Sequence, residues 1–430
     1  MTPTGLTGHG APDLVALRSR ATEVTGEVAA RLADPRKVAD TADFWIPLAL
    51  NDGHSGMALL FGELARKDPA HRPTVHAHLA ACAAALPGRP GAGLYHEVPA
   101  LTFAAHTARR VPDDYAGLLA RLDPAVDAAV RALLEQDRAR LAERRAGLPF
   151  SVYDATAGLA GLTRLLLARR PADDATLTAA VAHLLRLLTP LPRDGASVPG
   201  WWTPLGSHGR ADENLPDGHL NFGVAHGITG VLSALVTAHR AQVPVPGIDD
   251  GIRNIAELLM ARRTADGRWP ALIPLADFTA GRTPHPGRSA WCYGTPGVAA
   301  VLHRAGEALE RPDWRRAAVD AALLDLAEPS GVGDAGICHG WAGLLHLTTV
   351  LGHASGDSRF AALQDRFAAR TLDAYDPGRP FGFGQDPAAG AGGANSAGLL
   401  TGAAGIALAL HAYAAGAPPA GGWDAALLLS

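Results

Sequence analysis

Apolar residues along this chain recur mainly with the 3.6-residue period of an α-helix. Three amphipathic stretches rich in alanine and leucine show the pattern best: residues 123–145, 176–189 and 313–327. The alternation of apolar and polar residues that is typical of strands is scarce. An all-α protein is therefore predicted, because alanine and leucine are also among the strongest helix formers.

A second pattern, Gly-x-x-Gly followed by an apolar run, occurs six times and begins at Gly53, Gly158, Gly227, Gly294, Gly340 and Gly402. The interval between the first two copies is the longest, and residues 95–103 within it form a weak seventh copy without glycines. Alternation of a Gly-led apolar helix with an amphipathic helix predicts about seven hairpins in a ring, with the apolar helices inside. Glycine permits close backbone approach and leaves each inner helix N-terminus facing a shared cavity.

Three Pro/Gly-rich stretches interrupt the helical pattern: residues 191–221, 264–289 and 376–397. Because they show little periodicity, we expect them to form long surface loops around the cavity. Trp201 and Trp202 lie in the first of these stretches. They are expected to cover the core rather than to contact a substrate.

Composition narrows the class of protein. The chain has 430 residues, 48% of them hydrophobic, and a net charge of −4 with acidic and basic residues scattered throughout. No basic stripe is present that would match a phosphate backbone, so nucleic acid is not an expected partner. No segment resembles a secretory signal or a membrane span. Only three cysteines occur, an odd and sparse set that favours a reducing compartment, and a cytoplasmic protein is expected.

Reactive side chains stand one or two residues before the first glycine in three repeats. They are His226 in AHG, Cys292 in WCYG, and Cys338 and His339 in CHG. If the repeats form a ring, these positions converge at one end of the cavity. Two thiols and an imidazole suit Zn²⁺ and leave a fourth coordination position open, which is typical of a catalytic site. The alternative is that both cysteines are small buried hydrophobic residues, the role that we assign to Cys82.

Four segments resemble the conserved motifs of lanthionine synthetase C-like proteins, the cyclases of lanthipeptide biosynthesis: YDATAGLAG at 153–161, AHGITG at 225–230, WCYGTPG at 291–297 and CHGWAG at 338–343. The resemblance covers nearly the whole chain, including LLTGAAGIALAL at 399–410. It implies a double α-barrel, or α/α toroid, formed by residues 1–430 as a single domain. Zinc is then expected near one end of the central cavity.

The resemblance also implies roles for individual residues. The zinc ligands of the family fall on Cys292, Cys338 and His339. Its acid/base histidine falls on His226, and its other active-site residues fall on Asp154, Arg288 and Tyr293.

Each of the four catalytic candidates also has a structural explanation. His226 can be a hydrogen-bonded core histidine, and Asp154 can cap the helix that is expected to begin near residue 157. Arg288 can be solvated, and Tyr293 can pack beside the ligand. The main rival base is His219, whereas structural or surface roles are expected for His54, His96 and His346.

The reaction implied by the resemblance is the addition of peptide cysteine thiolates to dehydroalanine or dehydrobutyrine, which forms thioether rings. The expected substrate is a dehydrated precursor peptide that carries a leader. We expect a separate dehydratase, because no additional region of several hundred residues precedes the repeats. His226 is assigned to proton transfer, and either the removal or the delivery of a proton is compatible with this assignment.

Three other functions are compatible with parts of the pattern. A relative could add glutathione or another small thiol to dehydroamino acids with the same zinc chemistry. A carbohydrate-active toroid would use paired carboxylates in an aromatic cleft, whereas aromatic residues are only 6% of this chain. A zinc-stabilised peptide-binding scaffold would need a fourth protein ligand to close the site.

Overall fold

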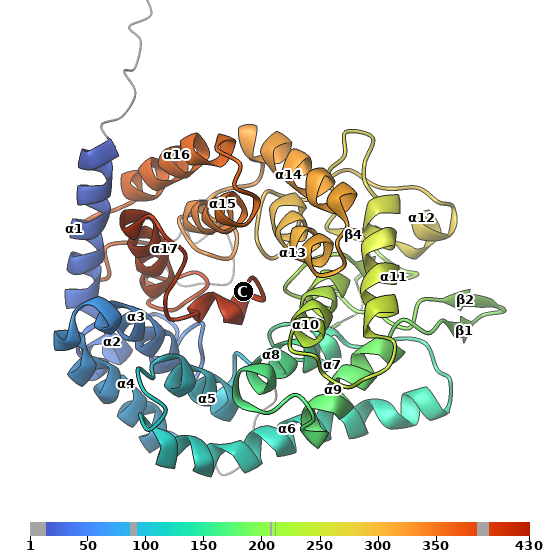
Figure 1. Ribbon diagram of the computed structural model, residues 1–430, viewed down its shortest axis with the longest axis horizontal. Helices are drawn as coiled ribbons and strands as arrows, with labels where there is room; N and C mark the ends of the chain where they lie inside the picture. The colour runs from blue at the N-terminus through green and yellow to red at the C-terminus, as the bar shows by residue number, and fades with distance from the viewer. Residues whose placement is uncertain (1–13, 87–92, 207–208, 211, 385–394) are drawn as a thin grey trace, which may run out of the picture.

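The computed structural model describes residues 14–86, 93–206, 209–210, 212–384 and 395–430. Within these residues most helices belong to two concentric rings (Figure 1). The inner ring consists of α3 (His54–Lys67), α5 (Glu97–Thr107), α8 (Leu159–Arg169), α10 (Ile228–Arg240), α13 (Thr295–Ala308), α15 (Trp341–Ser355) and α17 (Ala403–Ala415). The outer ring consists of α1 (Leu14–Leu32), α4 (Arg72–Ala84), α6 (Ala116–Ala142), α9 (Ala175–Arg186), α11 (Ile248–Ala261), α14 (Pro312–Ala327) and α16 (Arg359–Asp373).

Seven inner–outer pairs form the predicted α/α toroid. Six inner helices pack on the outer helix that follows them in sequence, and α17 packs on α1. Every inner helix also contacts the next one around the ring, and the contact of α17 with α3 closes it. The weak seventh repeat is α5, so the expected number of hairpins is confirmed.

The remaining elements are short. They are α2 (Pro35–Thr41), α7 (Phe150–Tyr153), α12 (Leu275–Thr279), the 3₁₀ helices η1 (Pro69–His71) and η3 (Trp423–Leu427), and the strands β1 (Leu191–Arg193), β2 (Ala196–Val198), β3 (His219–Asn221) and β4 (Leu272–Pro274). Strand β1 pairs antiparallel with β2, and β3 pairs antiparallel with β4.

Two details of the sequence-based prediction were wrong. Helix α6 begins at Ala116, about two turns before the predicted start at residue 123, and Pro124 lies inside it. The stretches 191–221 and 264–289 are not loops throughout, because they contain the four short strands and α12. Trp201 and Trp202 are buried there, as expected. The third predicted loop, residues 376–397, lies partly outside the described residues.

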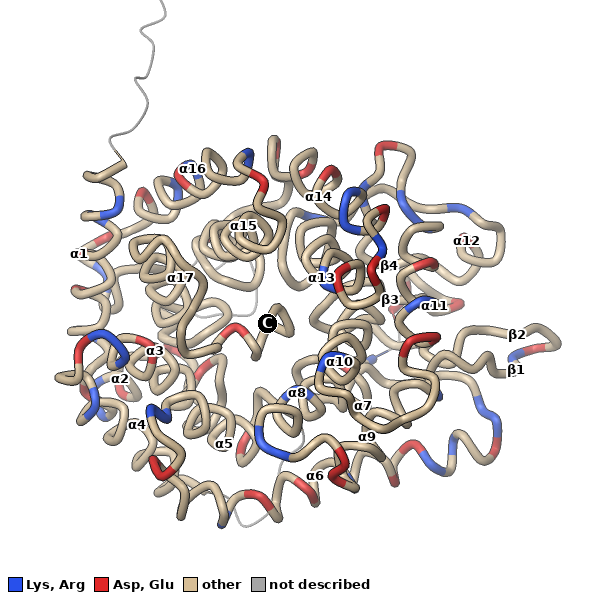
Figure 2. Tube along the Cα trace, in the orientation of Figure 1, with Lys and Arg blue, Asp and Glu red and all other residues tan. Residues whose placement is uncertain are grey.

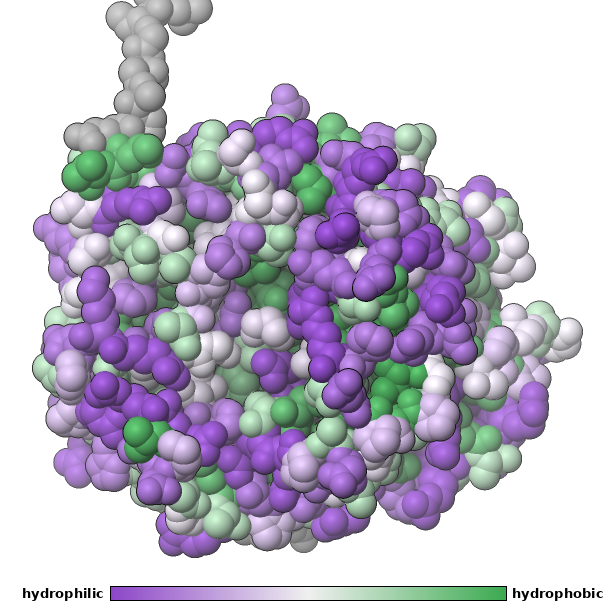
Figure 3. All heavy atoms as spheres, in the orientation of Figure 1, coloured by the Kyte–Doolittle hydropathy of each residue, from purple (hydrophilic) through white to green (hydrophobic). Residues whose placement is uncertain are grey.

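Burial explains the order of the two rings. Nearly every residue of an inner helix such as α10 is buried, whereas an outer helix such as α11 buries one face. Charged residues accordingly lie mostly on the outer helices and loops (Figure 2). In the face shown in Figure 3, hydrophilic side chains cover most of the surface, and hydrophobic areas appear in hollows and at the N-terminal end of α1. Among the described helices, none has the length and apolar character that a membrane span requires.

The second glycine of each motif lets an inner helix start against the segment that precedes it. A Cβ atom added at Gly405 would overlap the carbonyl oxygen of Leu399, and one at Gly297 would overlap that of Trp291. The other four second glycines meet the carbonyl six residues upstream in the same way. Any side chain there would push the helix away from its own preceding segment.

These preceding segments form a closed belt of backbone hydrogen bonds around the toroid. We define the belt as residues 50–51, 94–95, 155–156, 224–225, 291–292, 337–338 and 399–400. Each segment donates an N–H to a carbonyl of the next segment, and the seventh donates back to the first. The bonds are Leu50 to Tyr95 (3.1 Å), Tyr95 to Thr156 (3.0 Å), Ala155 to Ala225 (3.0 Å), Val224 to Cys292 (3.0 Å), Cys292 to Cys338 (3.4 Å), Cys338 to Leu400 (2.8 Å) and Leu399 to Asn51 (3.1 Å).

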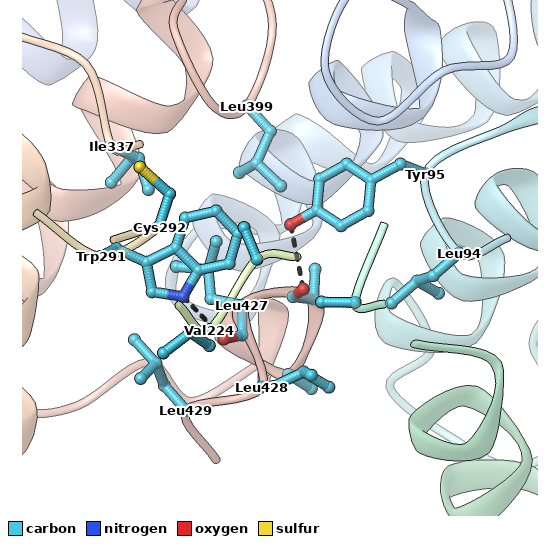
Figure 4. Packing of buried hydrophobic residues seen from close by; sticks show 14 of the residues in the cluster. Leu94, Tyr95, Val224, Trp291, Cys292, Ile337, Leu399, Leu427, Leu428 and Leu429 are labelled. Atoms are coloured by element: carbon cyan, nitrogen blue, oxygen red, sulfur yellow. Dashed lines mark hydrogen bonds between the residues drawn. The ribbon is translucent and has the colours of Figure 1, made fainter. Parts of the chain in front are cut away.

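Residues 423–429, which we call the central segment, are buried inside the ring (Figure 1) and pack against belt residues (Figure 4). Belt side chains bond its carbonyl groups. Tyr95 donates its hydroxyl to Ala426 at 2.9 Å, and Trp291 donates Nε1–H to Leu427 at 2.8 Å. The central segment therefore fixes the belt from inside, directly next to Cys292.

The close backbone approach at the second glycines predicts different effects for two Gly→Ala substitutions. Gly405→Ala should lower the free energy of unfolding by about 2–3 kcal/mol, because the helix must shift away from Leu399. Gly26→Ala in α1 should raise it by about 0.5–1 kcal/mol, because its added Cβ meets nothing within 4 Å and alanine favours helix. Urea denaturation of both variants checks this, and equal effects would refute the close-approach explanation.

Candidate functional site

A cavity of about 450 Å³ opens at the belt, between β3, β4 and the segments before α10, α13 and α15. Six of the seven predicted site residues line it: His226, Arg288, Cys292, Tyr293, Cys338 and His339. Asp154, the seventh, is buried and bonds to His226. A larger cavity of about 560 Å³ lies between α6 and α9, but no cysteine or carboxylate lines it. The chemistry of the side chains therefore favours the smaller cavity.

The belt explains why residues far apart in sequence meet here. Cys292 and Cys338 stand two residues before the first glycine of their repeats and are joined by a belt bond. His226, Tyr293 and His339 stand one residue before it, where the chain turns into an inner helix. Equivalent places in the repeats thus become neighbouring places around the cavity mouth.

The two thiols interact directly. Hydrogen bonding from Cys338 lowers the pKa of Cys292 to about 7, and the positive charges of His339 and Arg288 act in the same direction. The pKa of Cys338 is raised well above its usual value by the same hydrogen bond and by burial. The two thiols therefore titrate as a pair, in which the first deprotonation is easier than the second.

His226 is held by a buried carboxylate. Its Nδ1 lies 2.6 Å from Oδ2 of Asp154, while Oδ1 of Asp154 accepts the backbone N–H groups of Thr156, Ala157 and Gly158. Asp154 thus caps the turn that leads into α8 and orients the imidazole as well. Nδ1 carries the hydrogen in this bond because a carboxylate only accepts, which leaves Nε2 for proton exchange.

Burial and charge act in opposite directions on His226. Burial lowers its pKa, but the hydrogen bond and charge of Asp154, together with the charge at Cys292, outweigh burial and raise the pKa above the usual value. The imidazolium form is therefore accessible at neutral pH, as proton delivery requires.

Tyr293 and Arg288 complete the polar side of the cavity. The ring centroid of Tyr293 lies 6.1 Å from that of His226, and Asn221 hydrogen-bonds to the phenol. Burial raises the pKa of Tyr293, so the hydroxyl stays protonated and can donate. Arg288 is exposed at the rim.

The other histidines separate into two groups. His219 is buried, lines the same cavity and keeps a neutral imidazole because burial lowers its pKa. It therefore remains the rival of His226. His54 and His346 are buried away from the cavity, His54 against His78 and His346 against Asp424. His96 is exposed one residue before Glu97, which takes the place of the first glycine in the degenerate repeat.

Sequence reasoning missed two polar residues of the site. Asn221 lines the cavity beside Tyr293, and Asp334 bonds to His339. Both stand six residues before the first glycine of their repeats, Gly227 and Gly340. A comparison of equivalent repeat positions would have singled them out.

The donor types around the cavity fit zinc. Two contacting thiols and an imidazole with a fixed ring orientation line one cavity, and these are the ligands that zinc prefers. Within the described residues, no three His, Cys, Asp or Glu side chains lie close enough together to form a complete metal site. Coordination by Cys292, Cys338 and His339 would therefore require these side chains to draw closer.

The seven helical hairpins place this protein in the class of α/α toroid proteins. Its site combines two thiols with imidazoles that are held by carboxylates. The sequence matches the family model described as "Lanthionine synthetase C-like protein" over residues 45–428, and the chain belongs to this family.

Individual relatives are more distant. "Nisin biosynthesis protein NisC" of Lactococcus lactis subsp. lactis is 24% identical over 161 residues, which are 36% of this chain and 38% of that protein. The match thus spans well under two thirds of that relative. The solved structure of nisin cyclase is similar in fold, with a TM-score of 0.76 at 20% identity over 96% of this chain and 98% of the other.

The Asp154–His226 bond leads to a pH prediction. Asp154→Asn should lower the pKa of His226, because the amide cannot stabilise the imidazolium as a carboxylate does. In the wild type, the raised pKa contributes stability that is present below the pKa of unfolded histidine and is lost as the pH rises through the folded value. NMR titration of labelled histidines measures the change, with His339 as an internal control. An unchanged or raised pKa of His226 would contradict this account.

Proposed function

We propose that this protein is a zinc-dependent cyclase that adds peptide cysteine thiolates to dehydroalanine or dehydrobutyrine and forms lanthionine or methyllanthionine rings. One observation carries the proposal: in a lanthionine synthetase C-like chain, two contacting thiols and an Asp-oriented histidine face the same cavity. Cys292, Cys338 and His339 would hold the metal.

The reaction is an isomerisation in which a C–S bond forms. Zinc, when bound, lowers the pKa of a substrate thiol and so supplies thiolate near neutral pH. The sulfur attacks the β-carbon of the dehydroamino acid, and the electron pair of the C=C bond moves to an enolate. A proton then has to reach the α-carbon. The thiol proton that is lost balances the proton that is gained.

His226 is the residue best placed to move this proton. Asp154 fixes its Nδ1 side, so Nε2 is the nitrogen available for exchange. The raised pKa of His226 keeps its charged form available.

Tyr293 and Arg288 are the donors available for the developing enolate oxygen. Burial raises the pKa of the Tyr293 phenol, so it stays protonated, and it shares the cavity with His226 and Asn221. Arg288 adds a positive charge at the rim. Donors that are oriented before the reaction stabilise such charge more effectively than water does.

The physiological substrate that we propose is a dehydrated, leader-bearing precursor peptide, supplied in the cytoplasm by a separate dehydratase. Residues 1–430 would act as one domain. A small thiol such as glutathione could use the same chemistry, so a thiol-peptide substrate has to be compared with a free thiol and a dehydroalanine peptide. Ring formation exceeding intermolecular addition would favour the cyclase.

Zinc content tests the ligand assignment. Wild-type protein should contain about one zinc per chain, and Cys292→Ala, Cys338→Ala and His339→Ala should each lose most of it, because each removes one of three protein ligands. Cys82→Ala is the matched control, because Cys82 is a buried core thiol of α4. Elemental analysis measures the content. Full zinc occupancy in all three ligand variants would exclude this site.

His226→Asn tests proton transfer separately from metal binding. Asparagine keeps a hydrogen bond but exchanges no proton near neutral pH, so ring closure should slow by roughly 10²–10⁴-fold while zinc content stays near wild type. Alkylation of unreacted cysteines follows the isomeric reaction, with spontaneous closure subtracted. Loss of zinc would instead place His226 in the metal shell and support a closed binding scaffold, and unchanged closure would make His219 the next candidate.

A further inference from the structure

Two imidazoles at the cavity are each held by a buried carboxylate. Asp154 holds His226, and Oδ2 of Asp334 lies 2.7 Å from Nδ1 of His339. The Asp334 side chain is only 4% exposed. The two Asp–His pairs have the same geometry, but the proposed function gives their histidines different tasks.

We infer that Asp334 is a positioning residue that sets the tautomer and orientation of His339 for metal binding. Because a carboxylate only accepts hydrogen bonds, Nδ1 of His339 must carry its hydrogen, and the lone pair remains on Nε2. A metal-binding histidine with its second nitrogen bonded to a carboxylate is held in the ligating tautomer. The inference rests on the proposed function only in that His339 is the imidazole ligand.

The loop around Asp334 fixes the carboxylate itself. Its Oδ1 accepts the N–H of Gly336 at 2.6 Å, and its backbone carbonyl accepts the N–H of Trp341 at 3.0 Å. A Cβ atom at Gly340 would overlap Oδ1 of Asp334, so the glycine leaves space for the carboxylate. Asp334 thus satisfies two donors with two different oxygens, Gly336 with one and His339 with the other.

Another repeat of the same chain shows the bond that maintains the turn without the bond that holds a histidine. Asn221, in the equivalent place before Gly227, accepts the N–H of Gly223 with Oδ1 at 2.9 Å. Its neighbour His226 bonds instead to Asp154. An amide is therefore sufficient to maintain the turn at this position. A side chain that also accepts a hydrogen bond from a histidine needs a second oxygen, which a carboxylate provides.

Asp334→Asn follows directly from this comparison. The amide has one acceptor oxygen for the two donors of Gly336 and His339, so one of the two bonds must be lost. If the oxygen stays with Gly336, the NH₂ group faces Nδ1 and favours the tautomer with hydrogen on Nε2. That tautomer cannot bind a metal through Nε2.

Charge supports the same conclusion. The positive charge of Arg288 acts on Asp334 as well as on Cys292, Cys338 and His339. Asp334 offsets part of this charge near the place where a cation would bind. Removing the carboxylate leaves Arg288 less compensated and should further weaken cation binding.

The experiment compares Asp334→Asn with Asp154→Asn in the full-length protein. The zinc dissociation constant is measured by competition with a chromophoric chelator. Asp334→Asn should raise it roughly 10–100-fold, the usual effect of removing such a partner. Asp154→Asn should leave it within about twofold of wild type, because it breaks the same kind of bond at a histidine that is not a ligand.

A spectroscopic readout distinguishes positioning from general loosening. At saturating Co²⁺, the d–d absorption of Asp334→Asn should differ from wild type, and that of Asp154→Asn should not. If Asp334→Asn folds poorly, Asp334→Ser replaces it, because Ser396 occupies the equivalent place before Gly402. The free energy of unfolding of each metal-free variant, compared with that of the metal-free wild type, shows whether the variant is folded.

The outcomes separate the two claims. Wild-type zinc affinity and an unchanged Co²⁺ spectrum in a folded Asp334 variant would overturn the inference and leave the proposed function intact. Equal weakening in the Asp154 and Asp334 variants would also overturn it, because the effect would then not be specific to His339. A wild-type protein that binds no zinc would overturn the proposed function instead.

Discussion

The closed belt of backbone hydrogen bonds is the interaction on which the rest of the structure depends. Inner helices are buried almost throughout, so the segments that lead into them have no water to satisfy their peptide groups. The belt satisfies them by passing each N–H to the neighbouring repeat until the circle closes at Leu399 and Asn51. Small residues at the helix starts, such as Gly297 and Gly405, make this close packing possible. The cavity and its reactive side chains are a consequence of the same arrangement.

Much of this could be predicted because the repeat converts sequence position into spatial position. Six Gly-x-x-Gly motifs indicated the ring, and the long interval between the first two indicated a further inner helix, α5. In α5, Glu97 takes the place of the first glycine and has a positive φ of 46°. The family is likewise confirmed. The strands were missed because each has only three residues, too few for a period of two to appear. The start of α6 was misplaced because an internal Pro124 resembles a helix boundary.

For the site, the sequence predicted which residues face the cavity but not how they contact one another. Equivalent repeat positions predicted that Cys292, Cys338 and His339 would face one cavity, and they do. The roles of these residues remain predictions, since residue type does not specify the distance between donors. Asp334 was missed because its bond to His339 depends on a tight turn. One carboxylate–imidazole arrangement thus occurs twice, at His226 and at His339.

The central segment has a consequence for how a long peptide could be handled. Residues 423–429 lie inside the ring (Figure 1), bonded to Tyr95 and Trp291 at the belt (Figure 4). In the described part of the chain, this buried segment therefore blocks the middle of the toroid. Under the proposed function, a substrate cannot be threaded through from one end to the other. Each cysteine and dehydroamino acid of the peptide would enter and leave the cavity from the same side. The order of ring formation would then depend on successive rebinding of the peptide and not on its passage through the toroid.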